Sequence, residues 1–376
     1  MKKSLFPLIF GIILAAFTAY FMLDTFVIER VFDVPTEEYD YALFGRNGQE
    51  TETASGETGA LASAQTSPDA RTEETSPDAP AATPTESEKT PESAGVPAPE
   101  TLGGDETPDE SATPSPAPTT GETDGDAIAA PFTAQPVIGE NSYTDEHVAI
   151  FLSEERFSDT TVHIADVYLS SAEYLKTAFA HGKYGRNVKA TTSEIAKENG
   201  AIFAVNGDFY GARMWGYVLR NGQLYRSSSS GGEDLAIYPD GSFEIINERT
   251  VKASTLKEKN AWQVLSFGPA LLIDGEVSVK RSEEVGQAMA SNPRTAIGIV
   301  DKLHYIFIVS DGRVTESKGL SLYELAYYMK EKGAVTAYNL DGGGSSTMYF
   351  CGRIVNTVSS GKTNDERSIS DIVYIG

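Results

Sequence analysis

Short runs in which apolar and polar residues alternate follow one another between Tyr143 and Gly376, and this period of two predicts strands. The alternation is clearest from Thr161 to Leu169. Further runs of strand character are Ala201 to Val205, Ala296 to Val300, His304 to Val309, Ala334 to Leu340, Thr347 to Phe350 and Ile369 to Ile375. Tight hairpin turns are predicted at Asn221-Gly222, Asp240-Gly241 and Asp274-Gly275.

Two capping boxes predict helices between these strands. Thr191 and Glu194 open a helix that runs through Glu198, and Ser321 and Glu324 open another that stops at Gly333. Strand patterns outnumber helical ones, and no internal repeat is evident. We therefore predict a single α+β domain, residues 143–376, built around a large mixed β-sheet with a few helices.

The N-terminal pattern is of a different kind. Leu5 to Leu23 is uncharged and, at about 1.5 Å per residue, long enough to cross a bilayer core as a helix. Lys2 and Lys3 precede it and acidic residues follow, which predicts a single-pass cell-membrane anchor, residues 1–24, with a cytoplasmic N-terminus and an extracellular C-terminal domain. A cleaved signal peptide is the alternative, although a small-residue cleavage site is poorly matched.

Between anchor and domain, the composition predicts disorder. From Gly45 to Pro131 the chain contains no aromatic residue and consists largely of Pro, Thr, Ser, Ala, Gly and Glu. Such a segment buries too little apolar surface to offset its ordering entropy. We assign residues 25–44 to a juxtamembrane segment and residues 45–142 to a disordered acidic linker.

The charge is concentrated outside the predicted domain. The net charge is −24, and residues 24–142 hold 25 acidic against 4 basic residues, which leaves 29 acidic and 26 basic residues elsewhere. No basic face is indicated, so nucleic acid is not an expected partner. Cys351 is the single cysteine, which excludes an intrachain disulfide, and we expect its thiol to pack on a strand. An exported chain without disulfides is typical of bacteria rather than of an animal secretory pathway.

The most informative motif is Asn339-Leu340-Asp341-Gly342-Gly343-Gly344-Ser345-Ser346-Thr347, which lies between two predicted strands. Three consecutive glycines allow the backbone to approach a ligand closely, next to a carboxylate and several hydroxyls. This arrangement suits a polar, anionic ligand at the mouth of a sheet. A glycine-rich hairpin without a ligand is the alternative.

Other polar residues also stand at strand ends. Asn206 and Asp208 follow one strand, and Arg294 precedes another, where its planar guanidinium suits phosphate or carboxylate. Asp311 follows a third strand and Arg367 precedes the last. The alternative roles are a polar turn for the first pair and structural ion pairs for the arginines.

Several chemistries are not indicated. The four histidines lack zinc-ligand spacing, no lysine follows the glycines, and the serines do not form a Gly-x-Ser-x-Gly elbow. We therefore expect no cofactor, while leaving calcium open. Carboxylates, amides, hydroxyls and arginines remain, and these are the groups of glycosyl transfer and of sugar or phosphate binding.

Taken together, these motifs resemble the phosphodiester glycosidase family over about residues 162–376. The matching segments are Asn339 to Met348, Arg294-Thr295-Ala296-Ile297-Gly298, Asp311-Gly312, Gly319 to Met329 and Arg367 to Ile375. The resemblance implies a hydrolase that cleaves the bond between an anomeric carbon and a phosphodiester oxygen. It further implies a sugar-phosphate-containing glycan, wall polymer or exopolysaccharide as partner. A glycan- or phosphate-binding module and a P–O-cleaving phosphodiesterase remain as alternatives.

The resemblance also implies roles for individual residues. Asp341 and Asp311 are the predicted catalytic carboxylates. Arg294 and Arg367 would hold the phosphate, and free backbone amides of Gly342, Gly343 and Gly344 would assist them. The remaining predicted substrate-binding residues are Asn206, Asp208, Thr295, Asn339, Ser345 and Ser346. Asp208 departs from the family pattern, in which glycine is common at this position, so an obligatory acid–base role for it is not expected.

Overall fold

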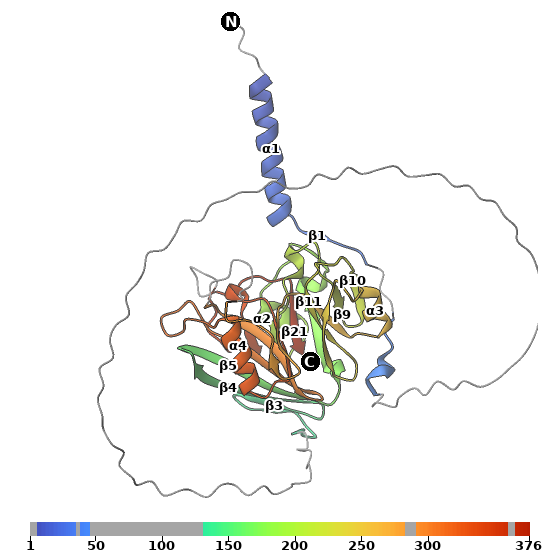
Figure 1. Ribbon diagram of the computed structural model, residues 1–376, viewed down its shortest axis with the longest axis vertical. Helices are drawn as coiled ribbons and strands as arrows, with labels where there is room; N and C mark the ends of the chain where they lie inside the picture. The colour runs from blue at the N-terminus through green and yellow to red at the C-terminus, as the bar shows by residue number, and fades with distance from the viewer. Residues whose placement is uncertain (1–5, 35–37, 46–130, 283–290, 360–364) are drawn as a thin grey trace, which may run out of the picture. The chain divides into compact units, whose positions relative to one another are not determined.

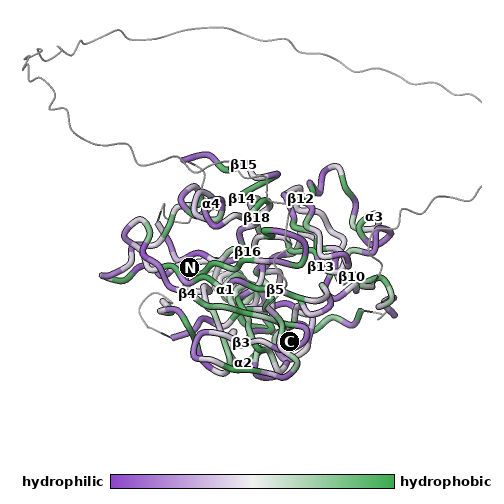
Figure 2. The backbone as a smooth tube through the Cα atoms, turned by 90° about the horizontal axis from the view of Figure 1, so that it is seen from below, coloured by the Kyte–Doolittle hydropathy of each residue, from purple (hydrophilic) through white to green (hydrophobic). Residues whose placement is uncertain are grey.

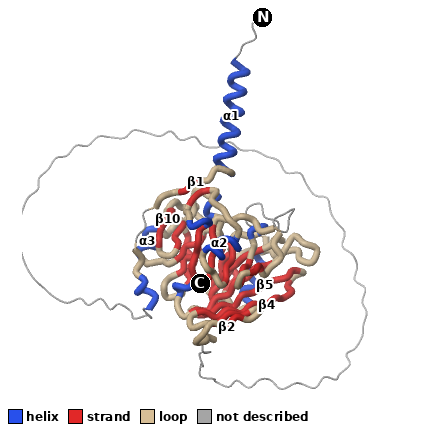
Figure 3. Tube along the Cα trace, turned by 180° about the vertical axis from the view of Figure 1, so that it is seen from behind, coloured by secondary structure: helices blue, strands red, loops and turns tan. Residues whose placement is uncertain are grey.

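The computed structural model describes residues 6–34, 38–45, 131–282, 291–359 and 365–376 (Figure 1). Most of the predicted linker, residues 46–130, lies outside these ranges. The described part of the C-terminal domain consists mainly of strands, as Figure 3 shows.

The largest sheet has nine strands, in the order β15-β14-β18-β16-β17-β5-β4-β3-β2. Their bounds are β2 Val137–Ile138, β3 Ser142–Thr144, β4 Val148–Phe157, β5 Thr160–Leu169, β14 Ala270–Ile273, β15 Glu276–Val277, β16 Arg294–Asp301, β17 His304–Ser310 and β18 Thr336–Asn339. The hairpin β16–β17 lies in the middle of this sheet, and its turn follows Asp301.

Two further sheets have five strands each. The first, in the order β20-β19-β8-β21-β6, comprises β6 Leu175–Phe179, β8 Phe203–Asn206, β19 Met348–Phe350, β20 Arg353–Ile354 and β21 Asp371–Ile375. The second, in the order β10-β9-β13-β11-β12, comprises β9 Val218–Arg220, β10 Gln223–Arg226, β11 Glu233–Ile237, β12 Phe243–Asn247 and β13 Gln263–Leu265.

Helices are few and short within the domain. They are α2 Thr192–Glu198, α3 Ala253–Glu258 and α4 Leu322–Glu331. Both predicted capping boxes are present, since Thr191 and Ser321 accept the backbone N–H of Glu194 and Glu324, and both glutamates accept in return. Gly333 follows α4 with a φ of 88°, a conformation that glycine adopts without strain.

The main hydrophobic core lies where the three sheets face one another. Its members come from all of them and include Phe203, Leu235 and Phe307. The opposite face of the nine-stranded sheet is covered by α4, whose Leu325 and Met329 pack on Ile308 and its neighbours. Figure 2 shows hydrophobic stretches along the interior strands and hydrophilic ones in the peripheral loops.

The predicted fold class is confirmed in its coarse form, a mostly β domain with few helices, but the sheet is not mixed. Every strand pairing among the described residues is antiparallel, because the chain builds its sheets largely from hairpins. Strands also begin at Val137, before the predicted domain start at Tyr143. The expectation for Cys351 was wrong: it is exposed in the turn between β19 and β20, with a φ of 42°.

The N-terminal helix α1 spans Phe6–Phe26, close to the predicted helix. Among the residues whose placement is described, no helix combines the length and apolar character that crossing a bilayer requires.

The segment after α1 packs on the C-terminal domain. Strand β1, Arg30–Val31, pairs antiparallel with β7, Gly185–Arg186. Further along, η1 spans Tyr41–Gly45, and the Tyr39 ring lies 5.1 Å from that of Trp262. The predicted juxtamembrane segment therefore forms part of the folded unit.

Candidate active site

Three strands of the nine-stranded sheet bring their polar end residues to one edge. Arg294, the first residue of β16, pairs with Ser310 at the end of β17, and Ala296 pairs with Asn339 at the end of β18. Because β16 runs antiparallel to both neighbours, its start meets their ends. Residues that follow β17 and β18 are therefore placed beside the residue that opens β16.

A cavity of about 160 Å³ opens at this edge. It is lined by Phe267, Asn292, Arg294, Arg313, Asn339, Leu340, Asp341, Gly342, Gly343 and Arg367. The structure therefore brings together six residues proposed from the sequence, which are Arg294, Asn339, Asp341, Gly342, Gly343 and Arg367.

Three guanidinium groups give the cavity a positive character. Arg294 is buried, and its Nε donates to the carbonyl oxygen of Leu320 at 2.8 Å. Arg313 donates from Nη2 to Asn292 Oδ1 at 2.7 Å, and Arg367 is exposed at the rim. Asp341 is the one carboxylate among the described lining residues, so the balance of charges suits an anionic ligand.

Asp341 is half-buried, with its Oδ2 shielded from solvent, and this desolvation raises the pKa of its carboxyl above the usual value. The Ser345 hydroxyl, the N–H of Gly342 and the charges of Arg367 and Arg213 oppose this shift. Oδ1 accepts the N–H of Gly342 at 2.9 Å. Perturbed carboxyl groups in a cleft are typical of catalytic sites.

Unpaired polar atoms are concentrated at this motif. Among the described residues, eight buried side-chain oxygens lack a hydrogen-bond partner of acceptable geometry, and five of them lie between positions 339 and 347. These five are Asn339 Oδ1, Asp341 Oδ2, Ser345 Oγ, Ser346 Oγ and Thr347 Oγ1. Buried polar atoms are normally paired, so a cluster of unpaired oxygens indicates a place where a ligand or ordered water supplies the partners.

The glycine turn differs from the predicted cradle of free amides. Gly342 donates its N–H to Asp341 Oδ1, and Gly343 donates to the carbonyl of Pro293 at 2.8 Å. These two donors are therefore used within the protein. Glycine is instead required by conformation and space, because Gly343 has a φ of 62° and a Cβ on Gly342 would lie 2.9 Å from the backbone carbonyl oxygen of Pro293.

Asn206 and Thr295 lie behind the cavity and hold the turn. The Asn206 amide donates to the Asp341 carbonyl at 2.5 Å, and its Oδ1 accepts the Thr295 hydroxyl at 2.8 Å and the Thr347 N–H at 3.3 Å. Asn206 thus connects the end of β8 to the glycine turn. Gly344, Ser345 and Ser346 are in the same turn but are not among the residues that line the cavity.

Asp208 has a different environment from the one predicted. Its carboxylate is buried against Arg220 at 2.7 Å, and Arg220 also contacts Asp371 at 2.9 Å. Burial and the charge of Asp208 raise the pKa of Asp371 to about 7, in spite of Arg220. Asp208 does not line the cavity, and its contacts describe a buried ion pair rather than a substrate ligand.

Asp311 also lies outside the cavity lining. Its Oδ1 accepts the backbone N–H of Thr357 at 2.9 Å and lies 3.2 Å from His163 Nε2, with both side chains buried. The carboxylate therefore joins β17, β5 and the segment before β21.

Phe267, Asn292 and Arg313 also line the cavity but were not predicted as site residues from the sequence. The signal for Arg313 was available, since it directly follows Asp311-Gly312, and Asn292 directly precedes Pro293-Arg294. Phe267 gave no such signal, because an isolated aromatic residue after a strand is typical of a core.

Comparison with known proteins supports a family resemblance. Residues 199–376, which include β8, β16 and the glycine turn, match the family described as phosphodiester glycosidase. This confirms the resemblance inferred from the motifs. An N-acetylglucosamine-1-phosphodiester alpha-N-acetylglucosaminidase of Mus musculus is 30% identical over 190 residues, which are 45% of this chain and 35% of that protein.

A prophage-derived uncharacterised protein of Bacillus subtilis, YomE, is 27% identical over 198 residues, covering 51% of this chain and 30% of that protein. The chain thus spans about a third of the length of these relatives. Among solved structures, the zebrafish N-acetylglucosamine-1-phosphodiester alpha-N-acetylglucosaminidase catalytic domain, auto-inhibited by its pro-peptide, is similar with a TM-score of 0.49 and 22% identity. That alignment covers 61% of this chain and 82% of the zebrafish domain.

Proposed function

We propose, from the match of residues 199–376 to the phosphodiester glycosidase family, that the domain hydrolyses the C1–O bond of a sugar-1-phosphodiester. The products are the free sugar and a phosphomonoester. The proposed substrate is a sugar-phosphate linkage on a cell-surface glycan or wall polymer.

The observation that carries this proposal is the composition of one cavity. Arg294, Arg313 and Arg367 line the same space as Asn339 and Asp341, each of which has a side-chain oxygen without a hydrogen-bond partner. A phosphodiester needs cationic donors, whereas a sugar needs hydroxyl and carboxylate acceptors for its hydroxyl groups. The cavity offers both sets next to each other.

This reaction does not require the protein to protonate the leaving group. Water attacks the anomeric carbon, the electrons of the C1–O bond pass to the phosphate oxygen, and the phosphomonoester leaves as a stable anion. Its charge is stabilised by the guanidiniums. Asp341 accepts the proton of the attacking water or stabilises the positive charge that develops on the sugar ring.

The proposal is tested with N-acetylglucosamine-1-phosphate esterified to p-nitrophenol, by measuring released N-acetylglucosamine. Hydrolysis in ¹⁸O-labelled water is expected to place the label in the sugar. Label in the phosphate would identify a P–O-cleaving phosphodiesterase, and binding without turnover would identify a binding module; either result overturns the proposal.

Asp341→Asn tests the assigned carboxylate. We expect turnover to fall by at least about 10²-fold, because proton transfer by a placed side chain contributes that much. Asp301→Asn is the matched control, since Asp301 is exposed at the opposite end of β16 from Arg294. Near-normal turnover of Asp341→Asn would remove Asp341 from the mechanism.

An extracellular location is a further part of the proposal, and it rests on the expected chemistry of the substrate. Protease added to intact cells is expected to degrade the C-terminal domain while a cytoplasmic marker survives. Protection of the domain equal to that of the marker would contradict this location.

A further inference from the structure

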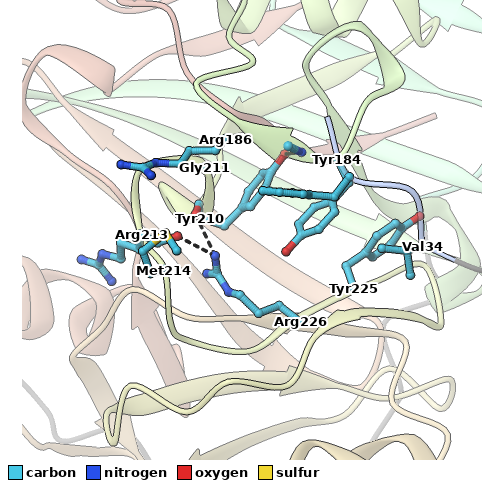
Figure 4. Close-up of a pocket in the computed structure, with 11 residues that line it drawn as sticks. Val34, Tyr184, Arg186, Tyr210, Gly211, Arg213, Met214, Tyr225 and Arg226 are labelled. Atoms are coloured by element: carbon cyan, nitrogen blue, oxygen red, sulfur yellow. Dashed lines mark hydrogen bonds between the residues drawn. The ribbon is translucent and has the colours of Figure 1, made fainter. Parts of the chain in front are cut away.

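A second cavity, of about 270 Å³, lies beside the loop that follows β8. Figure 4 shows Arg186 and Arg213 at one end of it and Tyr184, Tyr225 and Val34 at the other. None of the described residues that line it is acidic. Its volume is just below the range of drug-sized ligand pockets and suits one sugar unit.

Arg226 holds the loop that forms one wall of this cavity. Its Nε donates to the carbonyl of Gly216 at 2.6 Å, Nη1 donates to those of Tyr210 and Arg213, and Nη2 donates to that of Trp215. All four contacts are with neutral carbonyls, and burial lowers the pKa of this guanidinium. The charge of Asp208 acts on Arg226, but no carboxylate forms an ion pair with it among the described residues, so the guanidinium favours an anion in the cavity.

Aromatic rings supply the remaining wall. The rings of Tyr184 and Tyr210 stack with centroids 5.4 Å apart at an interplanar angle of 17°, and Tyr225 lies 5.1 Å from Tyr184. Tyrosine combines an apolar face, on which the C–H groups of a sugar ring can pack, with a hydroxyl for hydrogen bonding. Together with the arginines, these rings suit an acidic sugar better than a neutral or purely apolar ligand.

The second cavity adjoins the candidate active site through Arg213. This residue lines the second cavity, while its guanidinium lies 4.8 Å from the ring centroid of Phe267, which lines the first. Met214 and Trp215 follow it and are exposed. A polymer held in the active site could therefore reach the arginine-lined cavity past Arg213.

We propose that this second cavity binds a negatively charged sugar unit, carrying a carboxylate or phosphate, of the same polymer whose sugar-1-phosphodiester is cleaved. The inference rests on the proposed function and makes its substrate class more specific. Recognition of the acidic unit by the arginines raises the local concentration of the scissile bond at Asp341.

The segment after α1 contributes to this site. Phe32 and Val34 line the cavity, and the N–H of Phe32 donates to the carbonyl of Tyr184 at 3.0 Å. A substitution at Phe32 therefore alters the cavity without removing a side chain from the sheet core.

The experiment uses the full chain and three substrates that share an N-acetylglucosamine-1-phosphodiester. One carries p-nitrophenol, one a trisaccharide ending in glucuronate, and one the matching trisaccharide ending in glucose. We expect kcat/KM to favour the glucuronate substrate over the glucose substrate by about tenfold. This factor corresponds to one modest charge-assisted contact.

Arg186→Gln is expected to reduce this preference to about one, with the p-nitrophenyl substrate as the control for folding. Phe32→Ala removes an apolar contact and no charge, so it is expected to lower kcat/KM for both trisaccharide substrates and to leave the preference unchanged. Arg249→Gln is the matched control, because Arg249 is exposed and lines neither cavity. A preference that Arg186→Gln retains, or a wild-type preference of one, would overturn the inference.

Failure of the proposed function has a different signature, namely no hydrolysis of any substrate by the wild type. Binding of the glucuronate and glucose trisaccharides is then compared directly by tryptophan fluorescence, since Trp215 is exposed beside the cavity. Tighter binding of the glucuronate trisaccharide that Arg186→Gln removes would support the acidic-sugar site, and equal binding would refute it.

Discussion

Asp208 and Asp341 follow the ends of two strands; Asp208 is buried and Asp341 half-buried, with its Oδ2 shielded from solvent, and their surroundings differ. Asp208 contacts Arg220 and accepts the N–H groups of Tyr210 and Ser266, so its charge is compensated within the protein. Asp341 has one oxygen paired with the N–H of Gly342 and another without a partner. The comparison shows that burial of a carboxylate does not by itself indicate a functional site, whereas a shielded carboxylate oxygen without a hydrogen-bond partner does.

The largest expected effect comes from breaking the compensated cluster. Arg220→Met leaves Asp208 and Asp371 buried without a cation, which costs about 3–5 kcal/mol of the free energy of unfolding. Urea denaturation of the purified protein measures this cost. Lys302→Met, at an exposed hairpin, is the control and should change it by less than about 0.5 kcal/mol. A loss below about 1 kcal/mol in Arg220→Met would show that the cluster is not a structural requirement.

Asp341→Asn is expected to stabilise the protein, whereas Arg220→Met destabilises it. The substitution removes a desolvated charge, so the free energy of unfolding should rise by about 0.5–2 kcal/mol while turnover is lost. Thermal unfolding and turnover of the same preparation are compared. Destabilisation by this variant would mean that Asp341, like Asp208, has a structural partner.

The pH dependence sharpens the comparison. Because the pKa of Asp341 is raised on folding, its protonated form favours the native state below about pH 4. That contribution is lost as the pH rises through the folded pKa. The difference in stability between Asp341→Asn and the wild type should therefore grow over this interval.

Turnover by the wild type should increase over the same interval, because the charged carboxylate is the reactive form. The difference between the wild type and Asp341→Asn is the quantity to measure, because burial also raises the pKa of Asp371 to about 7 and that of Asp234 to about 9. If the stability of the wild type relative to Asp341→Asn and the turnover of the wild type changed in the same direction with pH, the role of charged Asp341 as the reactive form would be contradicted.

The smallest effect on stability concerns the hydroxyls. Ser346→Ala removes an unpaired oxygen, so the free energy of unfolding should change by less than about 0.5 kcal/mol. Thr160→Val is the control, because its hydroxyl contacts both the N–H and the carbonyl of Gly319 and should cost about 1–3 kcal/mol. Equal costs in the two variants would show that Ser346 is paired after all.

Much of the site was predictable because strand ends can be read locally. Arg294, Asn339, Asp341 and Arg367 were placed from the residues next to them, and all four line one cavity. The prediction failed where a residue's role depends on a distant partner. From the sequence alone, Asp208 is a candidate substrate ligand. The residues next to it do not indicate its ion pair with Arg220, which only the structure shows.

The alternation of residues, the capping boxes and the Asn-Gly and Asp-Gly turns determined the strands, helices and hairpins of this protein, since each depends on neighbours within a few positions. Only the tertiary structure decided that the segment after α1 packs on the domain and that Arg313 and Phe267 join the cavity. The physical reason is that packing between distant segments depends on the shape and charge of both surfaces, which a local pattern does not contain.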